Sequence, residues 1–206
     1  FRKLHEKAVV FIEYAPLETA WVPILGDNYL YLYCLWVSGS YKGKGYGKEL
    51  LQSCIDDAKA QGKSGICLLS SKKKKPFLSE KKFMLKYGFK VVDTINDEYE
   101  LLALSFDGTQ PQFTSNVRKQ SIEGKELTIY YGVQCPYIPN CIEQIYNYCE
   151  NNQIPLRLVE TDTLEKAKQL PCIFNNWANF YKGEFISNTI LNAKSFEKLM
   201  TKIKEE

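Results

Sequence analysis

Three glycines stand among lysines near position 45, and this spacing suits the binding of a phosphate group. Gly43, Gly45 and Gly47 alternate with other residues between Lys42 and Lys48. Because glycine lacks a Cβ atom and readily adopts a positive φ, an anion can reach the backbone N–H groups of such a loop. Each hydrogen bond to a charged acceptor contributes about 1.5–3 kcal/mol. We call residues 42–48 the glycine loop.

The residues on either side of the glycine loop predict a strand before it and a helix after it. Residues 29–37 are aromatic and branched, which is typical of a half-buried strand. After the loop, apolar residues recur with helical period until Gly62. They are Leu50, Leu51, Cys54, Ile55 and Ala58. The first turn of such a helix has N–H groups without intrahelical partners and a partial positive charge, so it favours anions.

Two common phosphate-binding motifs do not match the glycine loop. The dinucleotide pattern G-x-G-x-x-G is not met, and no P-loop occurs. Residues 42–47 instead resemble motif A of the GNAT (Gcn5-related) acetyltransferases, [QR]-x-x-G-x-[GA], although Lys42 replaces the usual Gln or Arg and Gly39 stands where proline is frequent. An unrelated α/β domain with a glycine-rich turn is the alternative.

The resemblance to GNAT enzymes implies a cosubstrate, acetyl-CoA. In that family the loop amides bind the pyrophosphate, and the edge of the preceding strand pairs with the pantetheine arm. The strand role falls on Leu35 and Val37. The residues implied in the loop are Lys42, Gly43, Lys44, Gly45, Tyr46, Gly47 and Lys48.

A second segment, residues 82–89, resembles motif B of the same family, in which an aromatic pair, a basic residue and Gly-Phe close a helix. Many members carry a tyrosine that protonates the departing CoA thiolate at the position of Met84. Methionine has no proton to donate. Tyr87 is one turn away, and we assign no catalytic acid.

Acyl transfer to an amine also requires a base and a group that stabilises the oxyanion. Glu13, on a strand predicted over residues 8–14, is the candidate base, and a solvated strand glutamate is the alternative. Tyr33 and Cys34 are further candidates. The N–H of Val37 or Leu35 would stabilise the oxyanion. We expect direct transfer without an acyl-cysteine, because one histidine, His5, gives no Cys/His pair.

The rest of the first half predicts alternating strands and one short helix. Strands are expected over 65–70, 89–94 and 98–106, and a helix capped by Ser79 and ended by Gly88. The four lysines at 72–75 are either a solvated loop or a site for a 3′-phosphate.

Beyond a turn-rich stretch at 107–112, a second pattern begins. Strands are expected over 127–131, 156–161 and 172–174, with a hairpin over 181–186. A helix should carry Ile142, Ile145, Tyr146 and Cys149 on one stripe, Thr161 or Asp162 should cap a short helix, and Phe196, Leu199 and Met200 should mark the last helix.

This order of elements resembles a thioredoxin fold over residues 124–206. Cys135 lies where glutaredoxin-like proteins have their redox loop, and Pro171 takes the place of their cis-proline. Ile138 replaces the second cysteine of C-x-x-C, so Cys135 is either a single reactive thiol or part of a docking module. With residues 73–79, this arrangement is similar to the YoaP-like acetyltransferases.

Composition limits the remaining choices. The 206 residues carry 27 Lys and Arg against 24 Asp and Glu, a net charge of +3 that does not favour nucleic acid as a partner. No apolar run is long enough for a membrane span and no signal-peptide pattern opens the chain, so we expect a cytoplasmic protein without membrane contact. The seven cysteines have no metal-binding spacing, so we expect reduced thiols and no metal.

The sequence therefore predicts an α/β (α+β) chain: a mixed-sheet GNAT domain over 1–107 that lacks its first strand and helices, a linker over 108–123, and a thioredoxin-like domain over 124–206. The predicted function is acetyl-CoA-dependent N-acetyl transfer to an amine on a small molecule or a protein. The alternative is a non-catalytic acyl-CoA-binding or thiol-redox/docking protein. The sequence leaves the acceptor and the oligomeric state open.

Overall fold

The computed structural model describes residues 1–4, 9–75 and 78–205. Four residues used in the sequence analysis, His5, Ala8, Pro76 and Phe77, lie outside this part of the chain. The chain divides into two compact units. The N-terminal unit comprises residues 1–20 and 24–114, and the C-terminal unit comprises residues 21–23 and 115–206.

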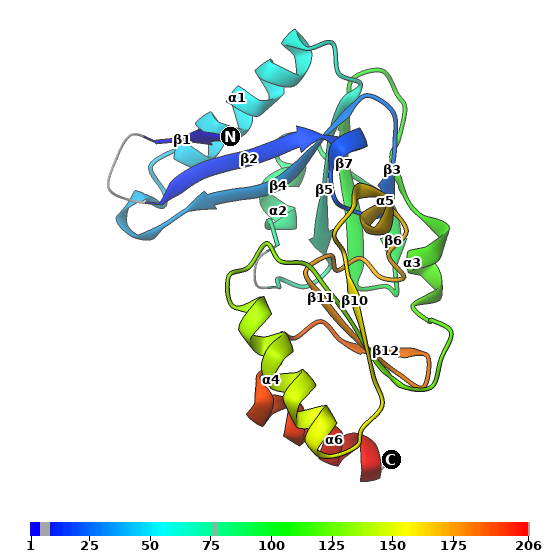
Figure 1. Ribbon diagram of the computed structural model, residues 1–206. Helices are drawn as coiled ribbons and strands as arrows, with labels where there is room; N and C mark the ends of the chain where they lie inside the picture. The colour runs from blue at the N-terminus through cyan, green and yellow to red at the C-terminus, as the bar shows by residue number, and fades with distance from the viewer. Residues whose placement is uncertain (5–8, 76–77, 206) are drawn as a thin grey trace. The chain divides into compact units, whose positions relative to one another are not determined.

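The N-terminal unit is built around a mixed six-stranded sheet in the order β1-β2-β4-β5-β7-β6 (Figure 1). The strands are β1 (Arg2–Lys3), β2 (Val10–Pro16), β4 (Tyr29–Val37), β5 (Gly65–Ser71), β6 (Lys90–Ile95) and β7 (Tyr99–Ser105). A separate two-stranded ladder joins β3 (Ile24–Leu25) to β8 (Gln112–Phe113). The helices are η1 (Leu17–Thr19), η2 (Gly39–Tyr41), α1 (Tyr46–Ala60) and α2 (Lys81–Leu85).

The strand and helix around the glycine loop form as the sequence predicts. β4 covers residues 29–37, and α1 ends at Ala60 before Gly62, whose φ is +64°. Leu51, Cys54, Ile55 and Ala58 are buried, and they pack with the core residues of β2, β4, β5 and β7. This apolar stripe fixes α1 against the sheet and thereby places its first turn at the end of β4.

The two central strands β4 and β5 pair only at their beginnings. They run parallel with Tyr29–Tyr31 opposite Gly65–Cys67, whereas β2 stays paired with β4 up to Val37. The register shifts between Glu13 and Tyr14 of β2, because these residues oppose Cys34 and Leu32 and leave Tyr33 of β4 as the extra residue. Beyond Tyr31, β4 and β5 diverge, as Figure 1 shows, and β4 has no ladder partner on that edge among the described residues. An edge of this kind can pair with an extended ligand.

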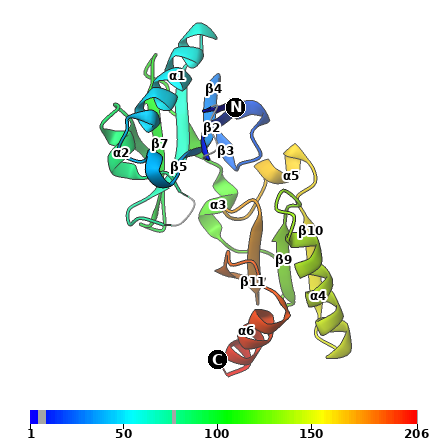
Figure 2. The same ribbon diagram turned by 90° about the vertical axis from the view of Figure 1, so that its left-hand side faces the viewer.

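The C-terminal unit contains a four-stranded sheet in the order β10-β9-β11-β12. Its strands are β9 (Leu127–Tyr131), β10 (Leu156–Glu160), β11 (Trp177–Tyr181) and β12 (Glu184–Ser187), and its helices are α3 (Ser115–Lys119), α4 (Ile138–Asn151), α5 (Leu164–Lys168) and α6 (Ala193–Glu205). β10 runs parallel to β9, and β11 runs antiparallel to both β9 and β12. Figure 2 shows α4 alongside β10 and α6 near the lower end of β11, and both helices contribute to one core with β9 and β11. This strand order accords with the thioredoxin-like description, which stays a prediction.

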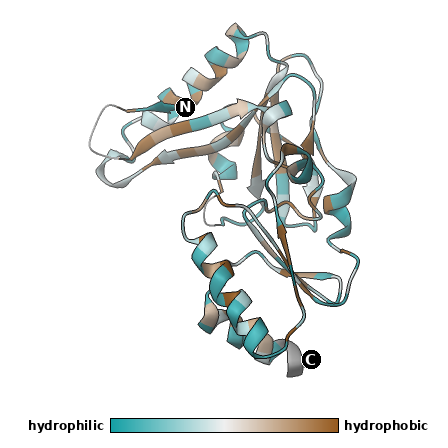
Figure 3. Cartoon of the chain, in the orientation of Figure 1, coloured by the Kyte–Doolittle hydropathy of each residue, from teal (hydrophilic) through white to brown (hydrophobic). Residues whose placement is uncertain are grey.

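Both faces of this second sheet are packed. One core joins Leu127, Ile129 and Trp177 with residues of α4 and α6, including Ile145 and Phe196. A smaller core on the alternate strand positions consists of Cys172, Ala178 and Phe180. In Figure 3 the hydrophobic colour is concentrated on the strands, while the helices alternate between hydrophobic and hydrophilic residues. The pattern reflects strands covered by helices that keep one face in water.

Several predicted details of the C-terminal unit are wrong. Residues 172–174 form no strand but a bend before β11. Thr163, rather than Thr161 or Asp162, caps α5 by accepting a hydrogen bond from the Lys166 amide. Tyr146 is 50% exposed, because it lies off the buried stripe of α4.

Two details that depend on single residues also differ from expectation. Ser79 does not cap the short helix, because Glu80 occupies the N-cap position and no side-chain cap forms there. No peptide bond among the described residues is cis, and this includes the bond before Pro171. The predicted linker, residues 108–123, contains β8 and α3.

Candidate functional site

The glycine loop leaves β4 and enters α1 through residues that need positive φ. Gly43 has a φ of +77° and Gly45, the N-cap of α1, has a φ of +91°. A Cβ atom built on either glycine would point into open space. Residues other than glycine rarely adopt a positive φ, so the two glycines determine the shape of the loop.

The loop leaves a row of backbone donors without protein acceptors. Lys48 and Glu49 both donate their amide hydrogens to the Gly45 carbonyl oxygen. By contrast, no residue in the described ranges accepts a hydrogen bond from the amide nitrogens of residues 43–47. These donors stand at the positive end of α1, which makes them suitable for an anion.

A cleft of about 550 Å³ opens beside these donors, and we call it the glycine-loop cleft. One side is formed by the loop and the end of β4, with Leu35, Val37, Tyr41, Lys42, Gly43, Gly45, Tyr46, Gly47 and Lys48. The opposite wall consists of Ser79, Glu80, Phe83, Met84 and Tyr87, from α2 and the residues flanking it. The cleft thus combines bare amides and two cations with a largely apolar wall.

The structure brings together nearly all of the predicted ligand-binding residues. Of the nine, only Lys44 is absent from the lining of the glycine-loop cleft. Its Nζ atom instead lies 5.4 Å from the ring centre of Tyr41, which in turn packs against Tyr46 at 5.7 Å. Tyr41 was not among the predicted binding residues, although an aromatic residue just before the glycines was a usable signal.

Met84, which stands where many family members carry a tyrosine, lies in the wall of the cleft opposite the loop. Met84 is 1% exposed and packs into the core, so it fills space at the cleft and offers no proton. Tyr87 lines the same wall, with its ring 4.9 Å from that of Phe83. The sequence analysis left the reach of Tyr87 open, and the structure places it in the cleft.

The predicted base lies outside the lining of the glycine-loop cleft. Glu13 is exposed on β2, where it is paired with Cys34 of β4. Burial raises the pKa of the Cys34 thiol, and the nearby charge of Glu13 raises it further. A thiol held neutral in this way is a poor nucleophile.

Three of the four lysines at residues 72–75 are paired with carboxylates. Lys72 pairs with Asp97 at 2.9 Å, Lys75 with Glu98 at 2.6 Å, and Lys74 lies 3.9 Å from Glu80. These contacts fit the solvated-loop alternative better than a phosphate site, because the charges of these three lysines are already compensated.

In the C-terminal unit, the Cys-Pro segment loses two backbone donors to Pro136 and Pro139. The Ile138 amide donates to the Cys135 carbonyl oxygen, and Pro139 at the start of α4 has no N–H. Cys135 is half-buried and packs against the core of this unit. Burial raises the pKa of Cys141, and the proximity of Cys135 adds to this increase.

Across the described ranges, we find no helix whose length and hydropathy would let it cross a bilayer. The same residues contain no group of three or more His, Cys, Asp or Glu side chains arranged to hold a metal ion.

Comparisons with known proteins agree on one family. The family profile "Acetyltransferase (GNAT) family" matches residues 3–89, and the profile "YoaP-like" matches residues 155–198. The chain is 41% identical to the uncharacterized N-acetyltransferase YoaP of Bacillus subtilis over 202 residues, which cover 97% of this chain and 80% of YoaP.

Solved structures with a similar fold overlap with part of the chain. PaiA N-acetyltransferase of Thermoplasma acidophilum, in complex with coenzyme A, is 24% identical, with a TM-score of 0.34 over 40% of this chain and 49% of its own. The GNAT family N-acetyltransferase YhbS of Escherichia coli, in complex with CoA, is 15% identical, with a TM-score of 0.36 over 51% of this chain and 60% of its own. The chain thus spans about half to three fifths of these solved proteins.

Proposed function

This chain belongs to the GNAT acetyltransferase family, and we propose that it binds acetyl-CoA in the glycine-loop cleft and transfers the acetyl group directly to an amine. The observation that carries this proposal is the row of unpaired amides at residues 43–47, beside a cleft of about 550 Å³. The acceptor is an amine on a small molecule or a protein.

The residues of the cleft suit the parts of acetyl-CoA. The amides of the glycine loop bind the diphosphate, and Lys42 and Lys48 add attraction for its negative charge. Phe83 and Met84 provide an apolar wall for the pantetheine arm. The open edge of β4 near Leu35 and Val37 pairs with the amides of that arm.

In the chemical step, the deprotonated amine attacks the thioester carbonyl, and the C–S bond breaks as the new C–N bond forms. A backbone N–H at Leu35 or Val37 stabilises the charge that develops on the carbonyl oxygen. Glu13 is the candidate to take the amine proton. The thiolate of CoA leaves and is protonated by Tyr87 or by water, since Met84 has no proton to give.

The alternative, a non-catalytic acyl-CoA-binding or thiol-redox protein, has less support. The 41% identity to an N-acetyltransferase favours the enzyme. The raised pKa of Cys34 supports direct transfer over an acyl-cysteine intermediate.

Calorimetric titration with acetyl-CoA tests the proposal, followed by release of CoA thiol on a panel of amines. We expect saturable one-site binding and thiol release that depends on the amine. Absence of binding by the intact protein would overturn the proposal, and binding without turnover on any amine would favour the non-catalytic alternative.

A further inference from the structure

Glu100 is a carboxylate buried inside the sheet of the N-terminal unit. It lies on β7 between β5 and β6, and its side chain is only 3% exposed. One oxygen, Oε1, accepts a hydrogen bond from Lys81 Nζ at 2.7 Å, whereas Oε2 is buried without a partner in the described structure. Burying a charge destabilises the folded state unless the charge is fully compensated. The stability of the fold therefore does not explain this residue.

The partner of Glu100 is the first residue of α2, and α2 is poorly stabilised by itself. The helix has five residues and no side-chain cap at Glu80. Isolated helices need about 12–15 residues to be even marginally stable in water. The position of α2 must therefore come from its anchors, which are the buried Met84 and the pair of Lys81 with Glu100.

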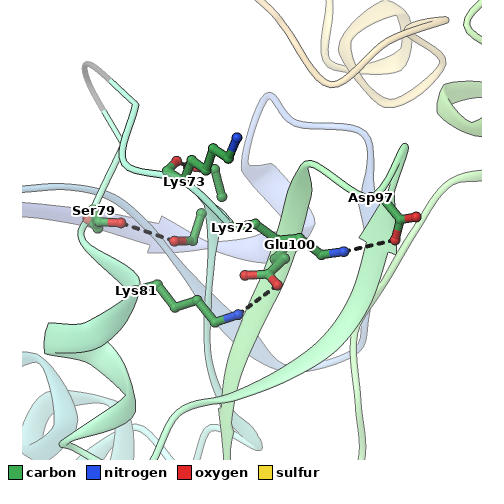
Figure 4. Close-up of polar contacts among 8 residues, drawn as sticks. Lys72, Lys73, Ser79, Lys81, Asp97 and Glu100 are labelled. Carbon is green, nitrogen blue, oxygen red and sulfur yellow. Dashed lines mark hydrogen bonds and ion pairs between the residues drawn. The ribbon is translucent and has the colours of Figure 1, made fainter.

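A second polar anchor lies directly beside the first. The buried Ser70 is opposite Glu100 in the ladder of β5 and β7, and its hydroxyl donates to the Ser79 carbonyl oxygen at 3.1 Å. Figure 4 shows both contacts reaching from these two strands to the start of α2. The two strands thus hold the segment that precedes and begins the helix.

The anchored segment is also the wall of the glycine-loop cleft. Ser79, Glu80, Phe83, Met84 and Tyr87 line it. The wall stands close to the loop, because a Cβ atom on Gly47 would lie 3.5 Å from Phe83 Cζ. A shift of α2 by about 1 Å would change the fit of any ligand between them.

We propose that Glu100 is a positioning residue of the acetyl-CoA site. Through Lys81 it fixes the start of α2, and α2 presents Phe83, Met84 and Tyr87 to the pantetheine and acetyl end of the ligand. The inference rests on the proposed function, since it assumes that acetyl-CoA occupies the glycine-loop cleft. It assigns no contact between Glu100 and the ligand.

The affinities for two ligands distinguish an effect on the position of α2 from a general loss of stability. Acetyl-CoA contacts both sides of the glycine-loop cleft, whereas adenosine 5′-diphosphate tests the glycine loop alone. In Glu100→Gln we expect the Kd for acetyl-CoA to rise about tenfold while the Kd for adenosine 5′-diphosphate changes less than about twofold. Lys81→Met should have the same effect, and the double variant should be no weaker than either single one, because both remove one contact.

The control is Lys72→Met, which removes an exposed ion pair with Asp97 and should leave both affinities unchanged. Equal losses for both ligands, or no loss for acetyl-CoA in either variant that remains folded by circular dichroism, would overturn the role of Glu100. If the unaltered protein bound no acetyl-CoA, the proposed function would fail instead. The two failures are therefore distinguishable.

Discussion

Two strand-to-helix junctions, one in each unit, show how similar connections acquire different chemistry. Residues 38–45 join β4 to α1, and residues 132–137 join β9 to α4. The first junction has glycines at φ +77° and +91° and a row of amides for which no acceptor occurs in the described part of the chain. The second has a proline at the start of its helix and an amide that is already bonded to Cys135.

The difference lies in which groups each junction leaves for a ligand. The glycine loop exposes backbone donors, which favour an extended anion such as a diphosphate. The Cys-Pro segment carries Pro136 and Pro139, which have no N–H, and places a half-buried thiol beside the core. We therefore propose anion binding at the first junction, where glycines shape the loop, and a role for the second only through Cys135.

The largest loss of acetyl-CoA binding is expected when a negative charge is placed in the glycine loop. Gly45→Asp should weaken acetyl-CoA binding at least about a hundredfold, since it strains a φ of +91° and repels the diphosphate. Titration calorimetry measures the loss. Gly108→Asp is the matched control, because Gly108 has a φ of +87° and open space around its Cβ but lies outside the cleft. Retained binding in Gly45→Asp would remove the glycine loop from the site.

A smaller change tests the distance between the two walls of the glycine-loop cleft. Gly47→Ala adds a Cβ atom 3.5 Å from Phe83 Cζ, an ordinary contact that the unliganded protein tolerates. Because alanine is the better helix former, the free energy of unfolding should rise by up to about 1 kcal/mol. Affinity for acetyl-CoA should nevertheless fall about tenfold as the passage narrows. Thermal melting and calorimetry on one sample give both values, and a parallel rise in affinity would contradict the assigned geometry.

The contribution of the loop cations should be modest and sensitive to salt. Lys48→Met is expected to weaken acetyl-CoA binding about three- to fivefold at low ionic strength, with less effect at high salt, because exposed charges are screened. Lys59→Met, near the other end of α1, provides the control. An effect of Lys48→Met that stayed constant with salt would indicate a direct structural role.

The smallest expected effect on acetyl-CoA binding concerns the second junction. Cys135→Ser should leave the affinity unchanged. In alkylation experiments between pH 7 and about 9, Cys135 should react before Cys149 and Cys172, because burial raises the pKa of these two to about 11 and about 12. Mass spectrometry of the modified peptides measures the order. Early modification of Cys172 in the folded protein would show that its surroundings are wrongly assigned.

The raised pKa values of Cys149 and Cys172 also predict that the free energy of unfolding decreases at high pH. The folded state keeps the protons of Cys149 and Cys172 above pH 9, where the unfolded chain loses them. Unfolding then releases protons, so this contribution to stability is complete below about pH 9 and declines as the pH rises toward 11 and 12.

The sequence predicted the local elements well where one pattern dominated. The aromatic and branched residues of 29–37 favoured a strand, and the apolar residues that end at Ala58 lay on one face of a helix. Predictions failed where neighbouring residues offered equivalent choices. Thr161, Asp162 and Thr163 are all capable caps, and the structure uses Thr163.

By itself, the sequence determined the glycine loop, because backbone conformation and bare amides follow from residue type and from the helix that begins there. Only the tertiary structure decided what stands opposite the loop. The wall of α2 and its buried anchor, Glu100, are separated from the loop by more than thirty residues. Contacts over such distances depend on how strands pair and helices pack, and no local pattern of residues encodes them.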